Sequence, residues 1–139
     1  MTGPELGLWL ALGTLLVATL FGLYWHSRQG RVRAPGMTTL PGPVLAQLDD
    51  TAAVTLLQLS TPICARCPQA RALLSELATA TPGVRHAELD LAEHPELANR
   101  LGVRSTPTTL VISHSGQELF RVAGVPRQAE LRTALQPHL

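Results

Sequence analysis

The chain contains two cysteines, Cys64 and Cys67, with only two residues between them. The pair follows the apolar run 54–59 and opens a predicted helix, so it lies at a strand-to-helix junction. The free N–H groups and partial positive charge of a helix N-terminus favour a thiolate at Cys64 and a pKa below that of an ordinary thiol. A thiolate attacks a disulfide, and Cys67, one helical turn on, can then resolve the mixed disulfide. The spacing predicts thiol–disulfide exchange with Cys64 as the nucleophile.

A zinc site and a pair of inert buried thiols are the two alternatives to redox chemistry at these cysteines. Zinc needs about four ligands. The spare histidines of the region, His86, His94 and His114, show no ligand spacing. We therefore favour redox chemistry that uses no metal and no cofactor.

Arg66 lies between the two cysteines. Its guanidinium could stabilise a Cys64 thiolate electrostatically. A solvated arginine on the first helical turn is an equally good interpretation. Arg66 is therefore a candidate site residue with two possible roles.

Strand-like and helix-like segments alternate from residue 54 onward. Strands are predicted over 54–59, 84–91, 108–113 and 117–123, and helices over 65–80, 93–101 and 126–135, with a short helix over 44–48. The candidate buried positions of the long helices are Ala70, Leu73, Leu74, Leu77, Ala129, Leu131 and Leu135. This order predicts an α/β fold in which a parallel β-α-β unit is followed by an antiparallel hairpin and a covering helix.

An uncharged apolar segment runs from Leu6 to Trp25 and is 20 residues long, about the length of a membrane-spanning helix. Trp9, Tyr24 and Trp25 lie near its ends, as in an interfacial aromatic belt. A cleaved signal peptide is the alternative, but it needs a basic n-region and a small-residue cleavage site, and neither is evident. We therefore expect residues 1–29 to form a retained transmembrane anchor with its flanks.

Arg28, Arg31 and Arg33 follow this segment, whereas no basic side chain precedes it. The positive-inside rule then places the C-terminal part in the cytoplasm, with the extracytoplasmic side as the alternative. Residues 30–43, rich in Arg, Gly and Pro, are predicted to be a linker, and residues 44–139 a folded domain. Removing residues 1–36 should then leave a soluble domain. The formal net charge of +1 gives no reason to expect a nucleic-acid partner.

Three motifs together resemble the thioredoxin family over about residues 54–135. They are the Cys64-Ala-Arg-Cys67 motif after a strand, the segment from Gly102 to Thr108, and Gly124 after the last strand. The resemblance implies a thioredoxin fold, in which a central mixed sheet is flanked by helices. With the N-terminal apolar segment and its arginine-rich flank, the chain is similar to membrane-anchored thioredoxin-domain proteins of high-GC Gram-positive bacteria.

The family resemblance also implies roles for individual residues. The Thr106–Pro107 bond should be cis and lie against a reversible Cys64–Cys67 disulfide, and Ile63, Arg66, Thr106 and Pro107 should contact an extended client. Ile63 stands where the family usually has tryptophan. Gln58 stands where thioredoxins have a buried acid that assists proton transfer at the resolving cysteine, so Gln58 is expected to modulate the rate.

The sequence thus predicts a membrane-tethered thiol–disulfide oxidoreductase that reduces protein disulfides with electrons from a donor that the residues do not identify. The alternative is a non-enzymatic adaptor or redox sensor that holds a partner at the membrane. Disulfide reduction by the soluble fragment distinguishes the two.

Overall fold

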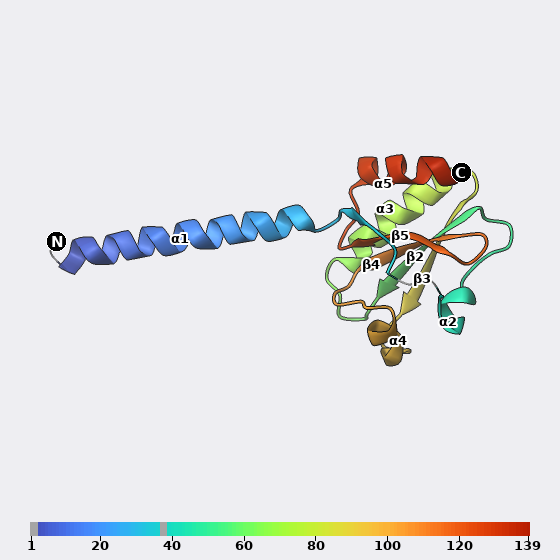
Figure 1. Ribbon diagram of the computed structural model, residues 1–139, viewed down its shortest axis with the longest axis horizontal. Helices are drawn as coiled ribbons and strands as arrows, with labels where there is room; N and C mark the ends of the chain where they lie inside the picture. The colour runs from blue at the N-terminus through green and yellow to red at the C-terminus, as the bar shows by residue number, and fades with distance from the viewer. Residues whose placement is uncertain (1–2, 37–38) are drawn as a thin grey trace.

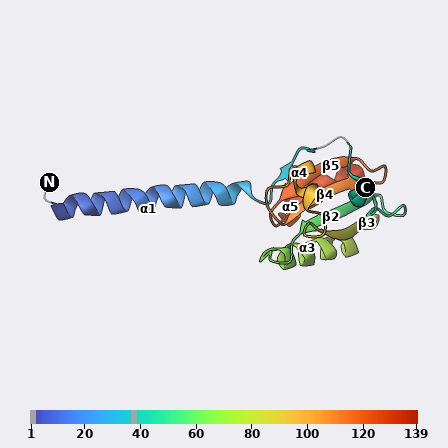
Figure 2. The ribbon, with the colours of Figure 1, turned by 90° about the horizontal axis from the view of Figure 1, so that it is seen from below.

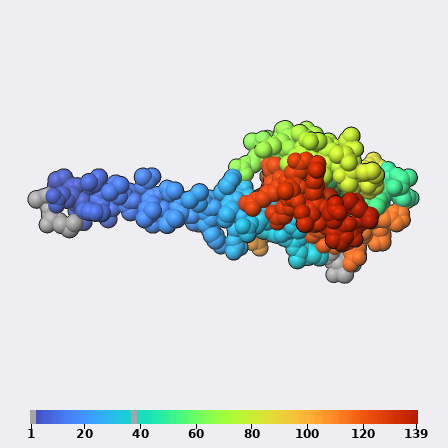
Figure 3. Space-filling view, turned by 90° about the horizontal axis from the view of Figure 1, so that it is seen from above, coloured from blue at the N-terminus to red at the C-terminus, as the bar shows by residue number. Residues whose placement is uncertain are grey.

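The computed structural model describes residues 3–36 and 39–139. Helix α1 (Gly3–Arg28) extends as a single rod away from the folded body (Figures 1 and 3), and none of its residues is buried. Its length and apolar composition fit a membrane span, and a signal sequence would fit them as well.

A five-stranded mixed sheet forms the centre of the body, in the order β1-β5-β4-β2-β3. The strands are β1 (Val32–Arg33), β2 (Val54–Ser60), β3 (Val84–Asp90), β4 (Thr108–Ser113) and β5 (Glu118–Ala123). Strands β2 and β3 are parallel, and the other neighbours are antiparallel. Every residue of β2 is buried, including the polar Thr55, Gln58 and Ser60. The cysteine motif therefore follows a strand that lies in the core.

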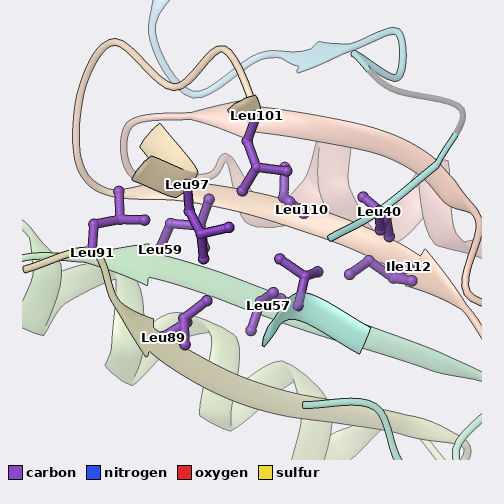
Figure 4. Packing of buried hydrophobic residues seen from close by; sticks show 10 residues of the cluster. Leu40, Leu57, Leu59, Leu89, Leu91, Leu97, Leu101, Leu110 and Ile112 are labelled. Atoms are coloured by element: carbon purple, nitrogen blue, oxygen red, sulfur yellow. The ribbon is translucent and has the colours of Figure 1, made fainter. Parts of the chain in front are cut away.

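Helices cover both faces of this sheet (Figures 1 and 2). They are α2 (Gly42–Leu45), α3 (Cys67–Ala80), α4 (Pro95–Arg100) and α5 (Gln128–Leu135), followed by the 3-10 helix η1 (Gln136–His138). Successive residues of a strand face opposite sides, so Leu56 joins the core with α3 and α5. Leu57 joins the other core, which includes leucines around α4 (Figure 4). The predicted thioredoxin fold is confirmed.

Helices α3, α4 and α5 begin two residues later than the sequence predicts, at Cys67, Pro95 and Gln128, and α2 begins two residues earlier than the predicted helix 44–48. Ala129, expected to be buried, is exposed, because the face of α5 that packs on the sheet is formed by Leu131 and Leu135. Four-residue spacing places those two leucines on one side of the helix.

Residues 30–43 are not an unstructured linker over their whole length. Val32 pairs with Val122 across β1 and β5, and the N–H of Gly30 donates to the carbonyl of Ala123 at 2.7 Å. Leu40 is buried in the core with α4. The segment after α1 is thus part of the folded body, and it joins the helix directly to an edge of the sheet.

Candidate active site

The two cysteines form a disulfide, with their Cα atoms 5.4 Å apart. Strand β2 ends at Ser60, and a tight turn follows in which the N–H of Cys64 donates to the carbonyl of Thr61 at 3.2 Å. Helix α3 begins at Cys67, and Pro68 fits its first turn because that nitrogen needs no helical partner. The pair therefore stands at the junction that the sequence predicts.

The two sulfur-bearing residues differ in exposure. Cys67 is only 3% exposed, whereas Cys64 is half-buried. Cys64, which precedes the helix, is therefore the more accessible of the two. An incoming disulfide therefore meets Cys64 first.

Two further loops lie beside the cysteine turn. The Thr106–Pro107 peptide is cis, as the family resemblance implies. The hydroxyl oxygens of Thr106 and Thr61 are 3.4 Å apart. The N–H of Gly124 donates to the carbonyl of Pro107 at 2.8 Å. The three motifs of the resemblance are thus brought to one edge of the sheet.

Ile63, directly before Cys64, is 95% exposed. An isoleucine side chain exposed to this degree forms almost no packing contacts within its own chain. At this position it adds apolar surface next to the reactive disulfide. Ile63 is therefore free to contact a client.

Gln58 is fully buried beneath the start of α3. Its Nε2 donates to the carbonyl of Cys67 at 3.0 Å, and its Oε1 lies 3.3 Å from Nε2 of His86. Nδ1 of His86 is in turn 2.9 Å from the hydroxyl of Ser75. A neutral imidazole with its proton on Nε2 satisfies both contacts. Gln58 thus bonds the main chain of Cys67 and is part of a polar chain with His86 and Ser75, and it offers no acid there.

Burial lowers the pKa of His86 below its ordinary value of 6.5, the nearby Glu88 carboxylate opposes this shift, and Arg71 adds to it. A folded-state pKa below the unfolded one means that the unfolded chain takes up the proton first as the pH falls. The stability present above about pH 6.5 is therefore lost progressively on acidification. The urea midpoint should be lower at pH 5.5 than at pH 7.5, and His86→Gln should flatten that difference.

The exposed His114 provides the matched control for this experiment. His114→Gln should leave the pH dependence between 5.5 and 7.5 as in the wild type. The same flattening in both variants would show that the half-buried imidazole of His86 is not its source.

A cavity of about 640 Å³ opens beside the disulfide, and both cysteines line it together with Ser60, Arg71 and Glu88. The Glu88 carboxylate accepts hydrogen bonds from the Ser60 hydroxyl at 2.6 Å and from two nitrogens of Arg71 at 2.6 and 2.7 Å. The Arg71 hydrogen bond, followed by that of Ser60, lowers the pKa of Glu88 against the opposing effect of burial. Glu88 is therefore ionised at neutral pH.

Glu88 does not stand out in the sequence. It is the direct partner of Gln58 across the parallel strands β2 and β3, so both side chains face the same side of the sheet. To find Glu88 from the sequence, one must know the register in which the strands 54–59 and 84–91 pair. Predicting each strand separately does not give that register. The carboxylate near this dithiol thus comes from the neighbouring strand.

Arg66 is exposed, and its Nη1 donates to Oε1 of Gln29 at 2.8 Å. Gln29 directly follows α1. Arg66 therefore contacts the segment through which α1 joins the body.

A mixed sheet with a Cys-x-x-Cys disulfide after β2 and a cis-proline beside it defines a thiol–disulfide oxidoreductase of thioredoxin fold. The sequence profile of the family described as Thioredoxin matches residues 45–137. The chain belongs to the thioredoxin family. The match begins after α1 and β1, so these two elements lie outside the part that defines the family.

Individual relatives agree with this assignment. The chain is 29% identical to Thioredoxin 1 of Nostoc sp. over 91 residues, which are 65% of this chain and 84% of that protein. Among solved structures, a mutant thioredoxin from Halobacterium salinarum matches with a TM-score of 0.60 and 22% identity, over 76% of this chain and 90% of that one. Fasciola hepatica thioredoxin matches with a TM-score of 0.55 and 23% identity, over 65% and 85%. The structural matches show the shared fold, and the family assignment supports thiol–disulfide oxidoreductase activity.

Proposed function

We propose that the chain is a membrane-tethered oxidoreductase that reduces disulfides of protein clients with the Cys64–Cys67 dithiol. The observation that carries this proposal is the disulfide between a half-buried Cys64 and a buried Cys67 at the start of α3. The apolar α1, none of whose residues Gly3–Arg28 is buried, supports the tether.

The reaction begins with the reduced pair. The Cys64 thiolate attacks a client disulfide, so a bond forms between Cys64 and one client sulfur while the other leaves as a thiolate. The Cys67 thiolate then attacks the Cys64 sulfur, releases the second client thiolate and closes the internal disulfide. Two electrons pass to the client, and a dithiol donor must restore the reduced pair.

Four residues around the cysteine turn are proposed to receive the client, namely Ile63, Arg66, Thr106 and Pro107. Thr106 borders the cysteine turn and offers main-chain groups to an extended segment, as in strand addition, while Pro107, whose carbonyl accepts from Gly124, shapes this loop. Ile63 offers apolar contact. The client is therefore expected to bind as an extended chain across the cysteine turn.

We propose that Glu88 takes up and returns the proton of Cys67 through water in the cavity that both residues line. In thioredoxins this proton transfer is assisted by the buried acid at the position that Gln58 occupies here. Glu88→Gln should slow resolution of the mixed disulfide by up to about 10²-fold, the lower end of what a positioned acid–base group contributes. Rapid-quench measurement of the mixed disulfide tests this.

Asp90→Asn is the matched control, because Asp90 lines the same cavity but its carboxylate accepts from the N–H of Ala92. An equal loss of rate in both variants would rule out a specific role for Glu88.

We place the dithiol in the cytoplasm, where the thiol pool keeps such pairs reduced. Arg28, Arg31 and Arg33 after the apolar helix support this orientation. A membrane-impermeant maleimide should then label the cysteines only after the cells are lysed. Labelling in intact cells would show that the dithiol faces the outside, and it would favour an extracytoplasmic client.

The decisive test of activity is reduction of insulin by the purified full chain, with dithiothreitol as the electron donor. The wild type should accelerate the reaction, and Cys64→Ser should not. If the wild type shows no activity, the enzyme proposal is wrong, and the non-enzymatic adaptor becomes the better interpretation.

A further inference from the structure

The C-terminal end of α1 is fastened to the active-site edge of the domain. Besides the contact between Arg66 and Gln29 at 2.8 Å, Nη2 of Arg127 donates to the carbonyl of Ser27 at 3.2 Å. The N–H of Gly30 donates to the carbonyl of Ala123, one residue before Gly124. Figures 1 and 2 both show α1 leaving the body at the end where α3 begins. The helix therefore departs from the edge that carries the disulfide.

Aromatic residues at the end of α1 lie close to the client-binding loops. A cavity of about 440 Å³ is lined by Tyr24 and Trp25 on one side and by Ser105 and Gly124 on the other. Ser105 precedes Thr106, and Gly124 is hydrogen-bonded to Pro107. Tyr and Trp at a helix end sit at the level of the lipid headgroups. If α1 spans the membrane, the cis-proline loop is thus held at that level.

Arginines surround the same end of the domain. Arg28, Arg31 and Arg33 lie at and after the end of α1, and Arg66, Arg104 and Arg127 come from three loops of the domain. All six are exposed. Each of the three loop arginines lines a cavity shared with the end of α1. Guanidinium groups bind phosphates bidentately, so this end of the domain suits an anionic leaflet.

We propose that the clients are membrane proteins whose disulfides lie at the headgroup level of the leaflet that the domain faces. The contacts between α1 and the active-site edge, reinforced by arginines on lipid phosphates, hold Cys64 at that depth. This inference rests on the proposed membrane tether. It adds a substrate class that the thiol–disulfide chemistry alone does not specify.

The test uses two synthetic single-span peptides in vesicles of phosphatidylcholine and phosphatidylglycerol together with the full chain. One peptide carries its disulfide at the bilayer surface. The other carries it on a rigid helix about 20 residues, or roughly 30 Å, further out. With dithiothreitol as donor, the surface disulfide should be reduced at least about tenfold faster, because the tether gives a high effective concentration at that depth only.

A variant with about 12 flexible Gly and Ser residues inserted between Arg28 and Gln29 releases α1 from the domain over roughly 20 Å. The contacts of Gln29 and Gly30 with the domain are kept. This variant should lose the preference for the surface disulfide and retain insulin reduction. The same segment appended after Leu139 is the control and should keep the preference.

The double variant Arg31→Gln and Arg104→Gln tests the contribution of the lipid phosphates, because neither side chain is one of the contacts that fasten α1 to the domain. Its preference for the surface peptide should fall in the anionic vesicles, with insulin reduction unchanged. An unchanged preference would overturn the role of these arginines.

Flotation of the vesicles separates the substrate class from the tether on which it rests. If the protein floats with the vesicles but reduces both peptides equally, the substrate class is wrong and the tether stands. If the protein does not float, the proposed tether fails, and the depth preference fails with it.

Discussion

Cys67→Ser is expected to accumulate covalent complexes with native clients, whereas Cys64→Ser should accumulate none. Cys64 is half-buried and meets a client disulfide, while Cys67 is 3% exposed and can act only on a mixed disulfide that has already formed. Both variants should reduce insulin no faster than the uncatalysed reaction, since each lacks one half of the exchange. Acid-quenched and alkylated membranes, run on non-reducing gels, display the complexes.

The double variant with both cysteines replaced by serine is the control and should yield no complex. Reducing agent should release every complex trapped by Cys67→Ser. If Cys64→Ser trapped clients equally well, the roles of nucleophile and resolving thiol would have to be exchanged.

Truncation before Gln29 and truncation before residue 37 are expected to give soluble domains of different stability. The shorter deletion keeps β1 on β5. The longer one removes β1 and two bonds in which the N–H groups of Val32 and Gly36 donate to Glu130 and Glu118, at 3.0 and 3.1 Å. Each lost hydrogen bond costs about 0.5–1.5 kcal/mol, so the loss of these two bonds alone should lower the free energy of unfolding by about 1–3 kcal/mol.

Urea unfolding of the two fragments measures this difference. Val32→Pro in the fragment that starts at Gln29 is a point variant for the same effect, since proline removes the N–H that Glu130 accepts. Equal midpoints for all three proteins would show that β1 adds nothing to the fold.

Most of the fold could be predicted because its main elements are coded locally. The apolar run that becomes β2 and the spacing of Ala70, Leu74 and Leu77 on α3 are strong patterns, and the structure has them. Strand β1 was missed because two residues show no periodicity. Their extended conformation comes from pairing with β5, which lies about 90 residues away in the sequence.

The residues of the site also fall into two groups, those that the sequence locates and those that it does not. The cysteine pair and Pro107 belong to short motifs, so sequence alone locates them. The partner of Gln58 and the carboxylate of Glu88 depend on how β2 lies against β3. That register is a tertiary property, and it decides which polar groups surround the resolving cysteine.

The pairing of β1 with β5 also governs when the domain can finish folding. Val32 is synthesised long before Val122, the residue with which it pairs. The sheet can therefore be completed only after β5 has left the ribosome. Closing so long a loop carries an entropic cost that grows slowly with its length, and non-local strand pairing is slow. If α1 has by then entered the bilayer, β1 is already fixed beside it. The last strand must then find its place beside β1 at the membrane surface.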